Sequence, residues 1–209
     1  MKRVYDQIKH GDVLKIKGKV NKFKDKLQIN IEEQEGTIKK AEAYEIEDFV
    51  EKSERDLDEM WEDLKNELDR IENPDLSKLV EAFYKDQELM EKYKKAPAAM
   101  YYHHAYLGGL MEHVLNMINL AKTLKSNYDS LDMDLLRIGS FLHDIGKVGE
   151  FKITSNISQS RKGLLTGHVS IGQEILLEKI KEVDDFPEKI KNKLLHIIIS
   201  HHGKKEHGK

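Results

Sequence analysis

The chain has 209 residues, of which 35% are charged and 39% are hydrophobic, and its 35 basic and 38 acidic residues nearly cancel. This length can bury the core of one large domain or two small ones, and the mixed charge argues against wholesale disorder and against a histone-like nucleic-acid binder. The absence of cysteine excludes disulfide scaffolds, thiolate zinc sites and cysteine nucleophiles. No apolar run approaches the roughly 18 residues of a membrane span and no signal-peptide pattern follows the basic start, so we expect a cytoplasmic protein.

Strands are expected in the first part of the chain, where residues 1–30 hold nine basic and three acidic side chains. Between Leu14 and Val20 apolar residues alternate with lysines, and the same period of two returns between Leu27 and Ile31. The polar stretch 21–26 predicts a hairpin connection between these two runs. A third run at 38–46 is ambiguous, and about three strands are too few to bury a core on their own.

Helices are expected in the acidic middle part, residues 31–95, and the connecting helices are assigned to 51–95. Ser53 and Asp56 resemble a capping box with Asp in place of Glu. The apolar stripe that follows has helical spacing and predicts a packed face, formed by Leu57, Trp61, Leu64, Leu68 and Ile71. Asn73-Pro74 ends that helix and begins the next.

The last part of the chain predicts four further helices, near 104–125, 132–145, 167–182 and 187–201. The pair Gly108-Gly109 interrupts the first of them. Because two adjacent glycines weaken a helix, they indicate close approach of another backbone or of a ligand.

Nine of the ten histidines lie after residue 100, and the sharpest motif is the adjacent pair His143-Asp144. Imidazole and carboxylate together favour Mn, Fe, Co, Ni, Mg or Zn over copper-thiolate chemistry. His113, His168 and the pair His201-His202 each sit in an apolar segment, where an unpaired imidazole would be costly. A single histidine in such a place is more often a hydrogen-bonded core residue than a ligand. The joint pattern over four helices instead predicts one internal site for one or two divalent ions.

The order of these residues resembles the HD superfamily of metal-dependent phosphohydrolases. Four segments narrow the resemblance to the YhaM-type 3′-5′ exoribonucleases, which join an N-terminal OB-fold to an HD domain: 94–114, 142–151, 164–172 and 196–208. The resemblance also covers the helical segment 56–80. It implies a mainly α fold, with a helical HD-type bundle preceded by a small, partial OB-like β region. The corresponding divisions are residues 1–50 for the β region, 51–95 for connecting helices and 96–209 for the HD domain.

The resemblance implies metal ligands at His113, His143, Asp144 and His168, with Asp144 able to bridge two ions. It implies a later ligand at His201, with His202 joining it or contacting substrate. Lys147, four positions after His143, either points at phosphate or is a surface lysine. His103 and His104 are interpreted as substrate or phosphate contacts. The histidines assigned to ordinary helix-face or surface positions are His10, His196 and His207.

The same resemblance implies a role in strand binding for the lysines of the β region. OB-folds bind single strands through basic grooves and stacked aromatic rings, so Lys15, Lys17 and Lys19, with Phe23 and Tyr5, are candidate strand contacts. The alternative is a solvent face whose lysines protect a sheet edge.

Two departures from the family pattern are expected. The match begins partway through the OB-fold, and the chain stops seven residues after His202, before the helix that carries a final Asp ligand in HD enzymes. We therefore expect half of the OB-fold and the last ligand to be missing, which bears on the activity of this chain.

The predicted function is that of a metal-dependent exoribonuclease. It would hydrolyse single-stranded RNA, and DNA as a second substrate, to nucleoside 5′-monophosphates with metal-activated water. One alternative is an HD phosphohydrolase of small nucleotides, whose basic strands form a homo-oligomer interface. The other is a nucleic-acid-binding module without turnover.

Overall fold

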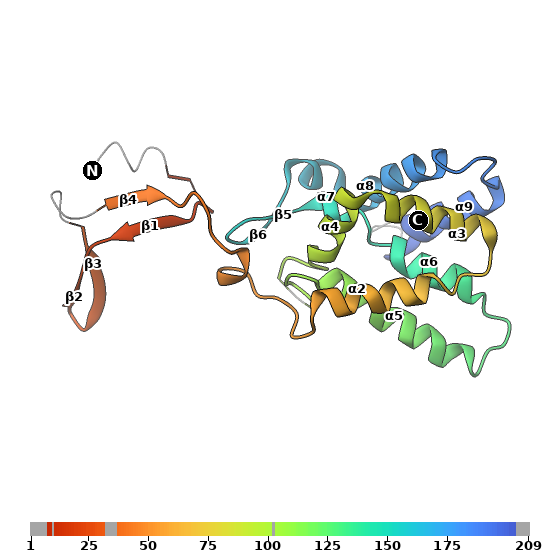
Figure 1. Cartoon of the computed structure of the whole chain (residues 1–209), viewed down its shortest axis with the longest axis horizontal. Coiled ribbons are helices and arrows are strands. Elements are labelled where there is room, and N and C mark those ends of the chain that lie inside the picture. Colours follow the sequence, from red (N-terminus) through yellow and green to blue (C-terminus); the bar gives the residue numbers. More distant parts are fainter. Residues whose placement is uncertain (1–7, 10, 32–36, 102, 204–209) are drawn as a thin grey trace. The chain divides into compact units, whose positions relative to one another are not determined.

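The computed structural model describes residues 8–9, 11–31, 37–101 and 103–203, which fall into two compact units. The first unit reaches Val50 and includes Ile153–Asn156, and the second holds the remaining residues (Figure 1). Helices dominate the second unit, so the prediction of a mainly α protein with a small β region is confirmed. Among the described residues, no helix is long and apolar enough to cross a membrane.

Two antiparallel strand pairs form the β region. β1 (Leu14–Lys17) pairs with β4 (Thr37–Lys40), and β2 (Lys19–Phe23) pairs with β3 (Lys26–Asn30). The single strand predicted from Leu14 to Val20 is therefore wrong, because the chain changes partner at Gly18. A Cβ at Gly18 would lie 2.6 Å from the backbone oxygen of Asn30, so this break needs a glycine.

The β2–β3 connection is tighter than the predicted stretch 21–26. It consists of Lys24 and Asp25, both with positive φ (48° and 61°), as in the two-residue turns that suit the twist of a hairpin. The ambiguous run 38–46 is only partly a strand, since β4 ends at Lys40 and the short 3₁₀ helix η1 (Ile46–Asp48) comes later.

Helices α2 (Leu57–Leu68), α3 (Pro74–Lys85) and α4 (Gln87–Lys95) begin the helical unit. Asp56 caps α2 by accepting hydrogen bonds from the backbone N–H groups of residues 58 and 59. The predicted capping box, with Ser53 as the cap, is therefore wrong. Ser53 instead donates its hydroxyl hydrogen to Glu112. Asn73 caps α3 as its sequence predicts.

The glycine pair starts helix α5 (Gly109–Lys125) rather than interrupting a helix that begins at residue 104. Gly108 has φ +79°, and Gly109 packs directly against the backbone of His104. Close backbone approach was thus predicted correctly, but His103 and His104 lie in the turn before the helix. The helix predicted at 132–145 is α6 (Met133–Leu142), and a turn leads from it to α7 (Lys147–Glu150).

A small two-stranded sheet of β5 (Phe151–Ile153) and β6 (Ile157–Gln159) follows, which the sequence did not predict. Helix α8 (Arg161–Lys181) begins six residues before its predicted start and is kinked at Gly167 (φ 68°). The last helix, α9 (Glu188–Ser200), matches its prediction closely.

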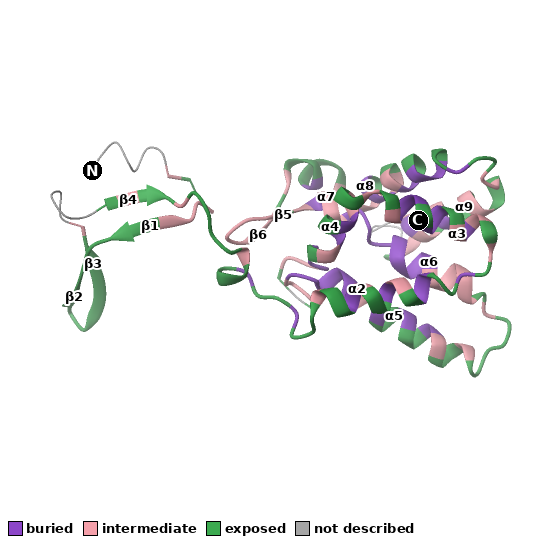
Figure 2. Ribbon diagram, viewed as in Figure 1, coloured by how far each residue is buried: buried purple, intermediate pink, exposed green. Residues whose placement is uncertain are grey.

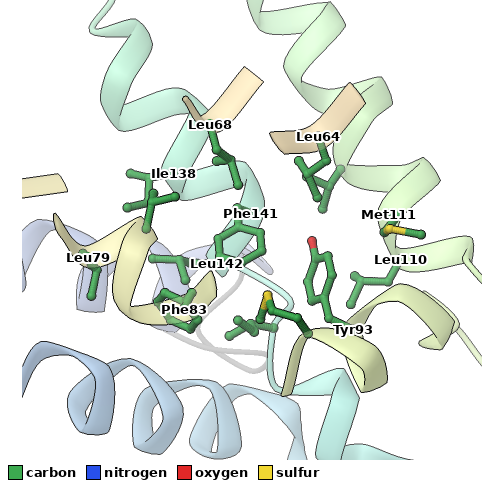
Figure 3. Close-up of a cluster of buried hydrophobic side chains, with 14 of the residues drawn as sticks. Leu64, Leu68, Leu79, Phe83, Tyr93, Leu110, Met111, Ile138, Phe141 and Leu142 are labelled. Carbon is green, nitrogen blue, oxygen red and sulfur yellow. The ribbon is translucent and has the colours of Figure 1, made fainter. Parts of the chain in front are cut away.

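The core of the helical unit surrounds α6. Phe141 of α6 packs its ring against Phe83 of α3 at 5.3 Å and against Tyr93 of α4 at 5.0 Å between centroids (Figure 3). Leu64 and Leu68 of α2 are buried in the same cluster, which confirms the predicted packed face. The helix that leads into His143-Asp144 is therefore fixed by close packing, and this fixes the position of the site.

Candidate metal centre

All six predicted ligands converge in the helical unit, although they come from four separate helices. His113 lies on α5, His143 and Asp144 follow α6, His168 follows the kink in α8, and His201 and His202 follow α9. Two groups of three can each hold a cation, since their ligand atoms lie within 4.8 Å of one another: His113, His143, Asp144; and His168, His201, His202.

The carboxylate of Asp144 links the two groups. Its Oδ2 lies 3.1 Å from Nε2 of His143, and its Oδ1 lies 3.4 Å from Nε2 of both His168 and His201. The remaining pairs are equally close, with 3.3 Å between Nε2 of His113 and His143 and 3.0 Å between Nε2 of His202 and His168. Asp144 therefore stands where a bridging ligand would stand.

Hydrogen bonds on the far side of the rings fix which nitrogen faces the centre. Nδ1 of His143 donates to the carbonyl oxygen of Ser140 at 2.8 Å, and Nδ1 of His201 donates to that of Ile198 at 2.8 Å. A carbonyl oxygen only accepts, so each neutral ring carries its hydrogen on Nδ1 and presents the Nε2 lone pair to the centre. This is the tautomer that a metal ligand requires.

The carboxylate of Glu150 fixes the ring of His168 in the same way, by accepting the hydrogen of Nδ1. The sequence did not predict this role for Glu150. Its Oε2 lies 3.1 Å from Nδ1 of His168, and the residue is only 8% exposed. Gly163 packs on the backbone of Glu150, which holds α7 against α8. Glu150 could have been found from the sequence as an acidic residue among the apolar neighbours Val148 and Phe151. A carboxylate buried at such a position needs a partner.

The donor set fits a divalent cation. Oδ1 of Asp144 is buried and has no hydrogen-bond partner among the described residues, even though two Nε2 atoms lie 3.4 Å away. Lone pairs that face one another and a carboxylate repel unless a positive charge lies between them. Mixed nitrogen and oxygen ligands of this kind suit Mn, Fe, Co, Ni, Mg or Zn, so the residues present fit the ions that the sequence predicted.

The electrostatics favour the metal-binding forms of His113 and Asp144. Burial would lower the pKa of His201, but the carboxylate of Asp144 outweighs it and raises the pKa of that ring. Burial, together with the neighbouring His143, lowers the pKa of His113 to about 4, so this ring is neutral near neutral pH. Burial alone would raise the pKa of Asp144, but its polar surroundings, with the positive charge of Lys147 among them, outweigh burial and lower the pKa. Asp144 is therefore a carboxylate at neutral pH.

A cavity of about 740 Å³ opens beside these residues, and it is lined by His103, His104 and Lys147 as well as by most of the ligands. Nζ of Lys147 lies 2.6 Å from Oδ2 of Asp144 and the side chain is mostly buried, so the surface-lysine interpretation is wrong. His104 has a left-handed backbone (φ 60°), and its Nδ1 lies 2.8 Å from the hydroxyl oxygen of Tyr106. Such a backbone is uncommon outside glycine and is concentrated at functional sites.

The other candidates lie elsewhere. Lys15, Lys17, Lys19 and Phe23 are exposed on β1 and β2, in the other unit. His196 is exposed on α9 and takes no part in the cluster, in agreement with its assignment as a helix-face residue. His10, His207 and Tyr5 are outside the described residues.

Comparison with known proteins identifies the class. Residues 110–208 match the family model of the HD domain. This segment is therefore similar to the HD domain, as the order of its histidines predicted.

Comparison with one curated relative narrows the similarity to a particular type of protein. The chain is 33% identical over 196 residues, or 94% of its length, to the 3′-5′ exoribonuclease YhaM of Bacillus subtilis (strain 168), and the predicted resemblance to that type is confirmed. The chain spans 61% of the length of that relative. No solved structure matches the chain.

Proposed function

We propose that this protein is a metal-dependent exonuclease that removes nucleotides from the 3′ end of single-stranded RNA as nucleoside 5′-monophosphates. The observation that carries the proposal is the convergence of Asp144 and five histidines, with their metal-binding atoms turned inward, on a cavity of about 740 Å³. The HD domain and the name of the similar protein from Bacillus subtilis support phosphodiester hydrolysis and RNA, respectively.

Each residue has a role in this proposal. Asp144 and the imidazoles hold the cations, while Ser140, Ile198 and Glu150 fix the rings from behind. Divalent ions held there would lower the pKa of a water molecule and neutralise charge on phosphate oxygens. Lys147, at the cavity wall beside Asp144, adds a fixed positive charge for a phosphate, and His103 and His104 contact the strand at the same cavity.

The lysines of the β region supply a second, weaker part of the proposal. Lys15, Lys17 and Lys19 are exposed on strands whose apolar side chains, Phe23 among them, are exposed as well. Basic side chains bind the phosphates of a strand regardless of sequence and release counterions. Replacing the three lysines by alanine should reduce the salt slope of RNA binding by about 0.7 per lysine. A matched triple variant at the exposed positions Lys78, Lys181 and Lys193 of the helical unit should not reduce it.

The test of the proposed function is incubation of 5′-labelled single-stranded RNA with the protein and Mn²⁺. We expect a ladder that shortens one nucleotide at a time from the 3′ end, and no product after metal removal with a chelator. Cleavage of free nucleotides without any shortening of the strand would overturn the proposal in favour of the small-nucleotide phosphohydrolase. Strand binding without product would favour a module that lacks turnover.

A further inference from the structure

Two chemically different groups of residues line the cavity beside the metal centre. One group consists of the imidazoles, Asp144 and Lys147. The other group, termed the apolar side, comes from three helices and the segment before α5, and it consists of Ala98, Met117, Leu135, Leu136, Gly139 and Ile197. These apolar residues have no part in holding ions, so the proposed chemistry leaves their presence at the cavity unexplained.

Part of the apolar side is accessible rather than buried in the core. Met117 on α5 is 37% exposed, and Leu135, Leu136 and Ile197 are partly exposed. Gly139 of α6 faces Ile197 of α9 so closely that a Cβ would lie 3.1 Å from its Cδ1. Apolar side chains that remain accessible next to a charged centre form a wall on which a ligand group with an apolar surface can lie.

From this we infer that the apolar side binds the base of the 3′-terminal nucleotide while its phosphodiester lies at the ligand cluster. The inference rests on the proposed function. A terminal nucleotide combines an anionic phosphate with a base whose faces are apolar, which matches the two sides of the cavity. The volume of about 740 Å³ lies within the roughly 300–1,000 Å³ typical of small-ligand sites.

The chemistry of the wall also sets its selectivity. Side chains of alanine, methionine, leucine and isoleucine cannot donate hydrogen bonds to a base edge, and apolar pockets discriminate weakly among ligands of similar shape. The wall therefore contacts the faces of the base, which all four bases share. The terminal base contributes to binding, while its identity matters little.

The experiment combines two substrates with two enzymes. Two 5′-labelled RNA pentanucleotides differ only in their 3′-terminal residue, which carries either a base or an abasic ribose. The measured quantity is kcat/KM for release of the first nucleotide with Mn²⁺, for the wild type and for Met117→Gln. Glutamine is close in length to methionine but polar, and the exposure of position 117 makes the change compatible with folding.

For the wild type, loss of the base should lower kcat/KM by about tenfold, the scale of one lost apolar contact group. Met117→Gln should lower kcat/KM for the intact strand and leave it unchanged for the abasic strand. The reason is that the abasic strand already lacks the base that would contact Met117. Leu120→Gln is the matched control on the same helix, since Leu120 is 61% exposed and does not line the cavity. It should behave as the wild type with both strands.

The outcomes separate this inference from the proposed function. If the wild type shortens both strands at the same rate, or if Met117→Gln slows both equally, the base does not lie on this wall and only the inference is overturned. A more than tenfold preference among the four terminal bases would also overturn it. If the wild type shortens neither strand, the proposed function itself is overturned, and the base site with it.

Discussion

The two units of the chain differ in how far their apolar side chains are buried. In the helical unit Leu64 is fully buried, and Phe83 and Phe141 pack around α6 (Figure 3). In the β unit Leu27 is 77% exposed, and β1, β2 and β3 consist almost entirely of exposed residues (Figure 2). A packed core can hold six ligands in a fixed geometry, whereas strands whose side chains are mostly exposed cannot. The candidate metal centre accordingly belongs to the helical unit, and the exposed lysines of the β unit suit charge-based binding.

The largest expected effect is a loss of activity in the helical unit without a loss of its fold. Asp144→Ala should lower the rate of RNA shortening by at least about 10³-fold, because it removes the carboxylate between the two groups of ligands. Helical content by circular dichroism should be unchanged. Full activity of Asp144→Ala would contradict the assignment of the site.

The second prediction compares aromatic residues of the two units directly. Phe141→Ala should lower the free energy of unfolding by about 3–5 kcal/mol, since it opens a cavity between Phe83 and Tyr93. Phe23→Ala, at an exposed position of β2, should change it by less than about 0.5 kcal/mol. Urea unfolding followed by circular dichroism measures both. Equal losses would show that the β unit is packed as tightly as the helical one.

The third prediction concerns the buried carboxylate behind His168. Glu150→Ala should weaken Mn²⁺ binding by about 10–100-fold, because the ring of His168 loses the group that fixes its tautomer. Glu150→Gln retains an acceptor and should have a smaller effect. The control is Glu178→Ala, at an exposed position of the same helix as His168. Titration calorimetry measures the affinities, and unchanged binding in Glu150→Ala would refute a positioning role.

A fourth and smaller effect concerns a buried charge in the helical unit. The carboxylate of Glu67 lies 2.5 Å from Nζ of Lys122 and within 3.5 Å of Arg70 and Arg137. Burial alone would raise the pKa of Glu67, but these cations outweigh it and lower the pKa. A lowered pKa in the folded state stabilises the protein above the ordinary glutamate pKa, and this contribution disappears as the pH falls through the folded-state value.

Glu67→Gln should therefore cost about 1–2 kcal/mol of stability at pH 7. The difference from the wild type should shrink as the pH falls below about 4.3, the pKa of glutamate in an unfolded chain. Urea unfolding at pH 7 and pH 3.5 measures both values. A deficit that is independent of pH would show that packing, and not charge, is lost.

The sequence predicted the residues that converge in the helical unit better than it predicted the strands. The convergent residues are His113, His143, Asp144, His168, His201 and His202. They could be found because each follows or lies within an apolar helical pattern, which is a local property, and because their order resembles that of the HD superfamily. Glu150 was missed because its partner His168 lies 18 positions away and only the folded chain brings the two together. The change of partner at Gly18 was missed for the same reason, since an alternating pattern does not say which strand pairs with which.

The most direct test of the account is the titration of Mn²⁺ into chelator-stripped protein, followed by calorimetry, for the wild type and for His143→Ala. The account predicts saturable binding of one or two ions per chain in the wild type and a large loss of affinity in the variant, with the helical fold of both retained. Absence of binding in the wild type, or equal binding by His143→Ala, would contradict the claim that these residues form a metal centre.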